Sequence, residues 1–267
     1  MRNSPTSINI FFACPKKFYY KYIVKLPEFP NIHSIKGRIV HKVLQNMFYN
    51  VKYVNPIEFV NKELNRIWNI EDLKIDKEQE AKEKQDALNI LGLYAFIHKK
   101  KIEGLVHSEK ANDLDHAWNL LRPKFREKKY KTEDLVGIVD KEEEDFQNRV
   151  SIVDYKTSHK YYNEFKDEYK RQARLYALLY YREYGKLPYY VKINFLRFGE
   201  IFIIEVTPDL IKLAEKDLEF VKSNTQSIDE KDYPKNVTRL CEWCDFKDEC
   251  FKQKEIQVKL EGGEKNE

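Results

Sequence analysis

The chain of 267 residues has little glycine, only two methionines and only four cysteines. It also lacks any apolar run of the roughly 18 residues that a membrane-spanning helix needs, and its first residues do not follow the pattern of a signal peptide. Few cysteines without an export signal argue against a disulfide framework. We therefore expect no membrane segment and a cytoplasmic location.

Neither sign of charge dominates, because the chain has 48 basic and 44 acidic residues and a net charge of only +4. This balance excludes a long basic tail or a wholly disordered chain. A phosphate-binding Gly-x-x-x-x-Gly-Lys loop is also absent from the sequence. The chain is thus not itself a helicase or ATPase, and such a motor would be a partner.

The apolar periodicity predicts helices and strands in a definite order. Helices are expected over 4–22, 36–50, 56–68, 77–101, 164–184 and 208–223. Strands are expected over 105–111, 135–141, 149–156, 189–197 and 201–206. A helical N-terminal part followed by a small mixed sheet flanked by helices predicts an α/β or α+β fold.

The most informative stretch is a pair of strands that carries two acids and a lysine, Gly137-Ile138-Val139-Asp140 and Val153-Asp154-Tyr155-Lys156. Side chains alternate along a strand, so Asp154 and Lys156 share a face that Asp140 can reach across the hairpin. Two carboxylates and an ammonium suit metal-assisted phosphodiester hydrolysis with Mg²⁺ or Mn²⁺. The alternative is a surface salt bridge of little consequence.

Two further features accompany this hairpin. His41 follows Gly37 in a helical segment, and Gln172 and Tyr176 are spaced i, i+4 on a later helix, so they share one face. Each feature alone is compatible with ordinary packing.

In order and spacing, these elements resemble the RecB-like branch of the PD-(D/E)xK nucleases, whose fold is the restriction-endonuclease-like core. The resemblance implies that His41, Asp140, Asp154 and the main-chain carbonyl of Tyr155 bind the catalytic metal. It also implies that Lys156 is catalytic and that Gln172 and Tyr176 line the active site.

The cysteines form the pattern Cys241-x-x-Cys244-x₅-Cys250, with Cys14 far away in the sequence. This spacing indicates a metal site, and by itself it fits zinc or an iron–sulfur cluster equally. The resemblance implies a 4Fe–4S cluster held by all four thiolates. Such a cluster would join the ends of the chain as a staple.

The resemblance extends from Cys14 to Cys250 and is strongest to the CRISPR-associated exonucleases of this branch. It implies one nuclease domain over 1–260, with a helical insertion at 56–103, a core at 104–206 and a disordered tail at 261–267. The implied activity is exonucleolytic digestion of single-stranded DNA in CRISPR adaptation, recombination or repair, with an integrase or helicase as partner. The alternative is a catalytically silent DNA-binding or scaffold subunit.

The segment Arg122 to Lys131 holds six cations and two aromatic residues within ten positions. Such a composition suits contacts with phosphates and unpaired bases, but a solvated surface explains it equally well. Glu109 is a further, weak candidate for an active-site carboxylate.

Overall fold

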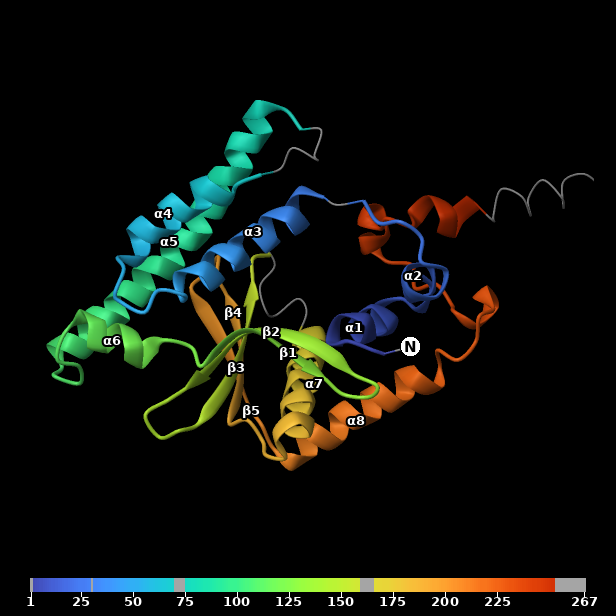
Figure 1. Ribbon diagram of the computed structural model, residues 1–267. Helices are drawn as coiled ribbons and strands as arrows, with labels where there is room; N and C mark the ends of the chain where they lie inside the picture. Colours follow the sequence, from blue (N-terminus) through green and yellow to red (C-terminus); the bar gives the residue numbers. More distant parts are fainter. Residues whose placement is uncertain (1, 30, 70–74, 159–165, 253–267) are drawn as a thin grey trace, which may run out of the picture. The chain divides into compact units, whose positions relative to one another are not determined.

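The computed structural model describes residues 2–29, 31–69, 75–158 and 166–252 (Figure 1). The chain forms two compact units. The sheet unit holds residues 30–215 with the first two residues, and the cysteine unit combines residues 3–29 with residues from 216 onward. The expected tail at 261–267 lies outside the described residues. No helix among the described residues is long and apolar enough to cross a membrane.

The sheet unit is built on a mixed five-stranded sheet with the spatial order β1-β2-β3-β4-β5. Its strands are β1 (Phe125–Lys131), β2 (Val136–Glu144), β3 (Val150–Lys156), β4 (Tyr190–Phe195) and β5 (Glu200–Glu205). Strands β3 and β4 are parallel and the other pairs are antiparallel. The parallel pair requires a crossover, which helix α7 (Lys166–Tyr184) provides. This arrangement confirms the expected α+β fold.

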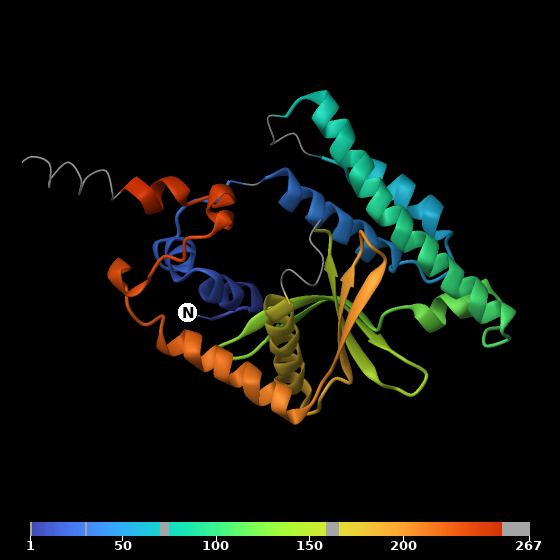
Figure 2. The same ribbon diagram turned by 180° about the vertical axis from the view of Figure 1, so that it is seen from behind.

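The two faces of the sheet are covered by different helices (Figures 1 and 2). Helix α7 packs on one face. On the other face a common core joins Val153 and Tyr155 of β3 to four helices. These are α3 (Ile32–Met47), α4 (Pro56–Ile67), α5 (Lys77–His107) and α6 (Leu114–Leu121). Side chains that alternate along β3 therefore enter two separate environments.

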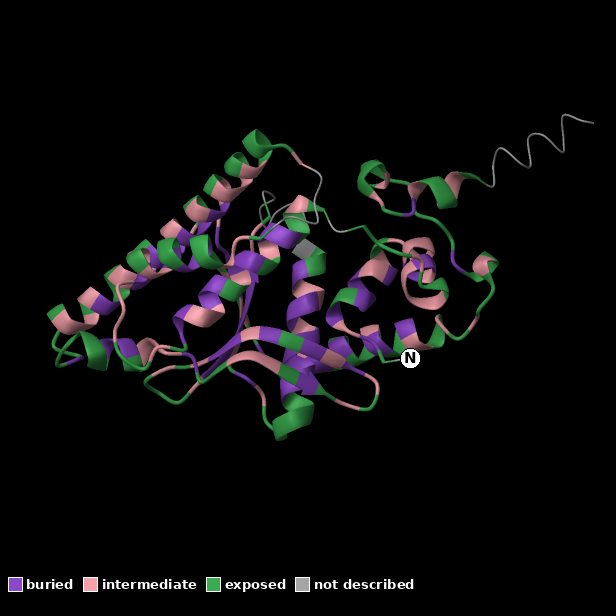
Figure 3. Ribbon diagram, turned by 45° about the horizontal axis from the view of Figure 1, so that its top comes forward, coloured by how far each residue is buried: buried purple, intermediate pink, exposed green. Residues whose placement is uncertain are grey.

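Helix α5 runs along this second face for 31 residues. It begins at a side-chain cap, in which Asp76 Oδ1 accepts a hydrogen bond from the N–H of Gln79 at 2.7 Å. Its buried residues, such as Leu91, Tyr94 and His98, recur at helical spacing and face the core, while other positions are exposed (Figure 3).

The observed elements correct the sequence-based expectations at several places. The strand expected over 105–111 is wrong, because helix α5 continues to His107. The helix expected over 4–22 is broken at Cys14, which adopts an extended conformation with φ −161°. Pro15 explains this break, since a proline disfavours the helical conformation of the residue before it. Helix α6 and strand β1 were not expected from the sequence, and α5 runs six residues beyond its predicted end. The remaining helices and strands of the sheet unit, and α8, begin and end within four residues of the predicted ranges.

The cysteine unit combines both ends of the described chain. It contains α1 (Pro5–Ala13), α2 (Pro15–Phe18), a π-helix (Tyr19–Val24), the second half of α8 (Pro208–Ser223) and two 3₁₀ turns (Glu230–Asp232 and Arg239–Trp243). Aromatic rings form much of its core. The ring of Phe11 lies 5.4 Å from that of Phe18 and 6.2 Å from that of Phe220, centroid to centroid.

Candidate active site

Asp140 on β2 is the centre of a group of polar side chains at one end of the sheet. Its Oδ1 lies 2.7 Å from Nδ1 of His41, and its Oδ2 accepts a hydrogen bond from the N–H of Tyr155 at 2.5 Å. The side chain of Asp140 is 11% exposed. Helix α3 thus brings His41 next to Asp140 on the β2–β3 hairpin. At Gly37 this approach is so close that a Cβ would lie 3.3 Å from Oγ1 of Thr157.

Glu127 on β1 joins this group, although the sequence analysis did not single it out. Arg126 pairs with Lys141 and Lys128 pairs with Val139, so the register places Glu127 opposite Asp140. Potential ligand atoms of His41, Glu127 and Asp140 all lie within 4.8 Å of one another. Glu127 also has a φ of 49°, a left-handed conformation that is unusual for a residue other than glycine.

Two carboxylates at facing positions of an antiparallel pair repel each other unless a cation lies between them. Burial, followed by the charge of Asp140, raises the pKa of Glu127. For His41, burial opposes protonation, but the charge and the hydrogen bond of Asp140 outweigh it and raise the pKa. Carboxylate oxygens with one imidazole nitrogen are ligands that suit Mg²⁺ or Mn²⁺. His41, Glu127 and Asp140, here called the metal-binding group, therefore fit a divalent metal ion.

Glu127→Gln is expected to weaken Mn²⁺ binding by about 10- to 100-fold, because the amide keeps the shape of the side chain but removes its charge. Isothermal titration calorimetry of the purified chain with Mn²⁺ measures this change. Glu133→Gln is the matched control, since Glu133 is an exposed residue in the turn between β1 and β2 and does not belong to the metal-binding group. Equal Mn²⁺ affinity of wild type and Glu127→Gln would exclude Glu127 as a ligand.

Asp154 and Lys156 lie beside this group on β3, on the face covered by α7. Nζ of Lys156 is 2.8 Å from Oδ2 of Asp154, and the two side chains are 22% and 7% exposed. Burial would lower the pKa of Lys156, but the charge of Asp154 outweighs this effect and the pKa is raised. Burial, partly offset by Lys156, raises the pKa of Asp154. The lysine is therefore held as an ammonium group at the edge of the metal-binding group.

Gln172 and Tyr176 on α7 both reach Asp154. The amide of Gln172 donates to Oδ1 of Asp154 at 3.2 Å, and the hydroxyl of Tyr176 donates to the same oxygen at 3.1 Å. Both side chains are buried. They fix the orientation of this carboxylate, so the helical spacing of Gln172 and Tyr176 does bring both residues to the site.

The backbone of Tyr155 also faces the site. Its N–H donates to Asp140, whereas the carbonyl of the next residue, Lys156, accepts from Leu196 on the β4 side. In an extended strand the N–H and C=O of one residue point to the same edge. The carbonyl of Tyr155 is therefore directed toward β2 and Asp140, which is compatible with its predicted role as a metal ligand.

Of the other candidates, the basic segment from Arg122 to Lys131 forms strand β1 from Phe125 onward and supplies Glu127 to the site. Glu109 is exposed after the end of α5 and is not part of the metal-binding group. A cavity of about 560 Å³ opens beside His41 and Glu127. Its wall is α3, from which His33, Arg38 and Lys42 contribute exposed basic side chains.

The four cysteines of the cysteine unit line a single small cavity together with Tyr20 and Phe246. All four are free thiols. Backbone N–H groups approach two of the sulfurs, from Asn236 to Cys14 at 3.5 Å and from Thr238 to Cys241 at 3.4 Å. Cys14 therefore lies at the same cavity as the three C-terminal cysteines, and four thiolates are a ligand set that zinc or an iron–sulfur cluster accepts.

Comparisons with known proteins address the fold and the family. The crystal structure of a "putative exonuclease" from Eubacterium rectale superposes with a TM-score of 0.51 at 13% sequence identity, covering 91% of this chain and 86% of that chain. The crystal structure of SSO0001, at 14% identity over 79% of this chain and 94% of that chain, gives a TM-score of only 0.27, which supports no inference. A search of curated proteins gave no match. The family model of the PD-(D/E)XK nuclease superfamily matches residues 2–251. The chain belongs to the PD-(D/E)XK nuclease superfamily.

Proposed function

We propose that this nuclease is a metal-dependent deoxyribonuclease that digests single-stranded DNA from an end. The observation that carries the proposal is the convergence of His41, Glu127 and Asp140 within 4.8 Å, beside the buried pair of Asp154 and Lys156. Acidic residues with an adjacent lysine suit metal-assisted phosphodiester hydrolysis, because the acids hold the metal and the ammonium offsets charge on the phosphate.

His41, Glu127 and Asp140 would hold the metal ion, with the carbonyl of Tyr155 directed to the same place. A divalent ion held there would supply Lewis-acid chemistry, namely polarisation of a phosphate oxygen and a lower pKa for a water molecule. Asp154, fixed by Gln172 and Tyr176, orients the ammonium group of Lys156. This ammonium offsets the negative charge that develops on the phosphate oxygens during hydrolysis.

The cavity beside the metal-binding group suits a DNA strand. Its exposed cations, Arg38 and Lys42 on α3, are spaced i, i+4 and share one helix face. Such cations neutralise phosphates irrespective of sequence. His33 extends the same wall. We infer that the backbone of the substrate follows α3 toward His41.

We further propose that the four cysteines hold a 4Fe–4S cluster. All four cysteines line one cavity, and backbone N–H groups lie near the sulfurs of Cys14 and Cys241, an arrangement that suits either zinc or a cluster. The choice of an iron–sulfur cluster rests on the resemblance of the cysteine pattern to the RecB-like branch.

The biological setting that we propose is CRISPR adaptation or recombination and repair. This rests on the resemblance of the sequence motifs to the RecB-like branch, which spans both the metal-binding residues and the four cysteines. The same resemblance points to an integrase or a helicase as the partner, and residues 1–267 themselves contain no nucleotide-triphosphate-binding loop.

Degradation of an end-labelled single strand with Mg²⁺ or Mn²⁺ tests the activity. We expect the linear strand to be shortened and the closed-circular form of the same strand to stay intact, because an exonuclease needs an end. Chelation of the metal should stop the reaction. Cleavage of the circle at the same rate would show an endonuclease instead, and tight DNA binding without cleavage of either strand would favour a scaffold role.

A further inference from the structure

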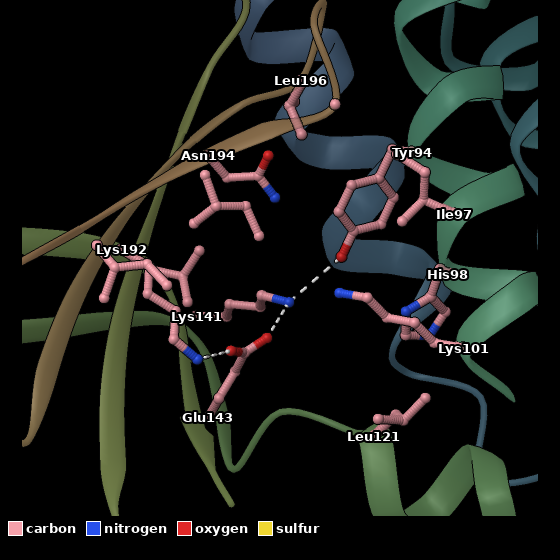
Figure 4. A pocket seen from close by; sticks show the side chains of 14 residues that line it. Tyr94, Ile97, His98, Lys101, Leu121, Lys141, Glu143, Lys192, Asn194 and Leu196 are labelled. Atoms are coloured by element: carbon pink, nitrogen blue, oxygen red, sulfur yellow. Dashed lines mark hydrogen bonds and ion pairs between the residues drawn. The ribbon is translucent and has the colours of Figure 1, made fainter. Parts of the chain in front are cut away.

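A second cavity lies on the opposite face of the sheet from Asp140 and Asp154, between α5 and strands β2 to β5 (Figure 4). Its volume is about 310 Å³. One part of its lining is charged, with Lys101 from α5, Lys141 and Glu143 from β2, and Lys192 from β4. None of these residues belongs to the proposed active site.

The charged part is built around one buried lysine. Lys141 is only 6% exposed, and its ammonium is bound by Glu143 and by the hydroxyl of Tyr94 at 3.3 Å. Glu143 also binds Lys192, at 3.1 Å. Burial opposes ionisation of Glu143, but these two lysines outweigh it and lower the pKa to about 2. Glu143 is therefore a carboxylate that two lysines share.

The charges of the lining do not cancel. Three lysines face one carboxylate, which leaves a surplus of two positive charges. Lys101 makes no ion pair among the described residues, and its ammonium points toward Lys141 (Figure 4). Burial, and then the charge of Lys141, lowers the pKa of Lys101. An uncompensated pair of positive charges in a concave site is stabilised by an anion.

A neutral polar group and an apolar surface complete the cavity. His98 is 7% exposed, and its Nε2 has no hydrogen-bond partner among the described residues. Burial, with the charges of Lys141 and Lys101, lowers the pKa of His98 to about 3, so the imidazole is neutral at physiological pH. Ile97, Ile201 and Ile203 form an apolar side of the cavity. Such a mixture of a few polar groups and apolar walls is typical of small-molecule sites.

We propose that this cavity binds a small phosphomonoester, with the phosphate dianion held by Lys101, Lys141 and Lys192 and the organic group packed against the apolar side. A phosphate dianion matches the surplus of two positive charges. The volume suits a ligand about the size of a mononucleotide, at the small end of ordinary ligand pockets.

The site is separate from the active site but lies directly behind it. The backbone N–H of Tyr155 donates a hydrogen bond to Asp140 in the active site. The hydroxyl of Tyr155 lies 3.1 Å from the hydroxyl of Tyr94, which accepts a hydrogen bond from Lys141 in the second cavity. A ligand on Lys141 therefore occupies the far side of the strands that carry Asp140 and Asp154. The choice of a deoxynucleoside monophosphate as probe rests on the proposed function, since hydrolysis of DNA from a 3′ or 5′ end can release it.

Isothermal titration calorimetry without divalent metal tests the proposal, with inorganic phosphate, deoxyadenosine monophosphate and deoxyadenosine as probes. We expect the monophosphate to bind, and Lys101→Met and Lys192→Met to weaken that binding at least about tenfold. Lys100→Met is the matched control, because Lys100 is the neighbouring position on α5, pairs with Glu103 and does not line the cavity. The Lys100→Met protein should bind the monophosphate with the affinity of wild type.

Lys156→Ala separates this site from the active site. Retained binding in Lys156→Ala supports a second site, whatever the nuclease assay shows. Loss of binding in Lys156→Ala, or equal binding in wild type and Lys101→Met, would overturn the proposal. Equal affinity for phosphate and for the monophosphate would support the anion site and overturn the role of the apolar side. Binding of deoxyadenosine as tightly as its monophosphate would overturn the anion site.

Discussion

Lys156→Ala is expected to slow hydrolysis of single-stranded DNA by about 10²- to 10³-fold, the usual cost of removing one group that stabilises charge in a transition state. The variant should still bind DNA, since exposed cations such as Arg38 remain. Single-turnover cleavage of an end-labelled strand at saturating enzyme measures the chemical step. The melting temperature should be recorded alongside, because Asp154 loses its ion-pair partner in the variant and keeps only the hydrogen bonds from Gln172 and Tyr176.

Lys186→Ala is the control for this experiment, since Lys186 is an exposed lysine after α7. It should cleave at the wild-type rate. A Lys156→Ala protein that is folded and as active as Lys186→Ala would show that another group supplies the positive charge, or that the activity comes from a contaminant.

Cys250→Ala is expected to remove most of the cofactor and to unfold the cysteine unit. The binding free energy of a structural metal is folding free energy, on the order of 10 kcal/mol, and one missing thiolate forfeits a large share of it. The small cavity that the four cysteines line would lose one wall. We expect a lower yield of soluble protein, a lower melting temperature, and loss of the broad visible absorption of thiolate-bound iron–sulfur clusters.

Trp243→Ala is the matched control, because Trp243 lies between two of the cysteines and its side chain is 76% exposed. This variant should keep its iron content and its melting temperature. A soluble Cys250→Ala protein with unchanged iron and melting temperature would contradict a structural cluster. Detection of one zinc ion and no iron in the wild-type protein would show that the cysteines hold zinc instead of a cluster. The stabilising role of the metal site would be unchanged.

The fold and much of the site could be predicted because the signals are local. The alternation along β3 placed Asp154 and Lys156 on one face, and the i, i+4 spacing placed Gln172 and Tyr176 together on α7. A helix was expected across Cys14, although the dipeptide Cys14-Pro15 indicates a helix end there, because a proline disfavours the helical conformation of the residue before it. The strand expected at 105–111 failed because a short apolar run cannot by itself distinguish a strand from the end of a helix.

Glu127 could not be predicted with the same ease, because its position depends on the register between β1 and β2. Its local signal was that it is the one acid among the cations of Arg122–Lys131. An unfavourable backbone conformation and a facing carboxylate became visible only in the structure. The second cavity is likewise a tertiary feature, since Lys101, Lys141 and Lys192 come from three separate elements.

The division of the chain into two units has a consequence for its synthesis on the ribosome. Residues 30–215 form a nearly self-contained stretch, so the sheet unit can fold as soon as they have emerged. The first part of the cysteine unit, with the aromatic residues Phe11 and Phe18, has to wait until residue 216 and those after it are made. During this interval an apolar segment stays without its partners and is prone to aggregate. Slow translation of the part of the message that encodes residue 216 and those after it should therefore lower the yield of native protein more than its final stability suggests.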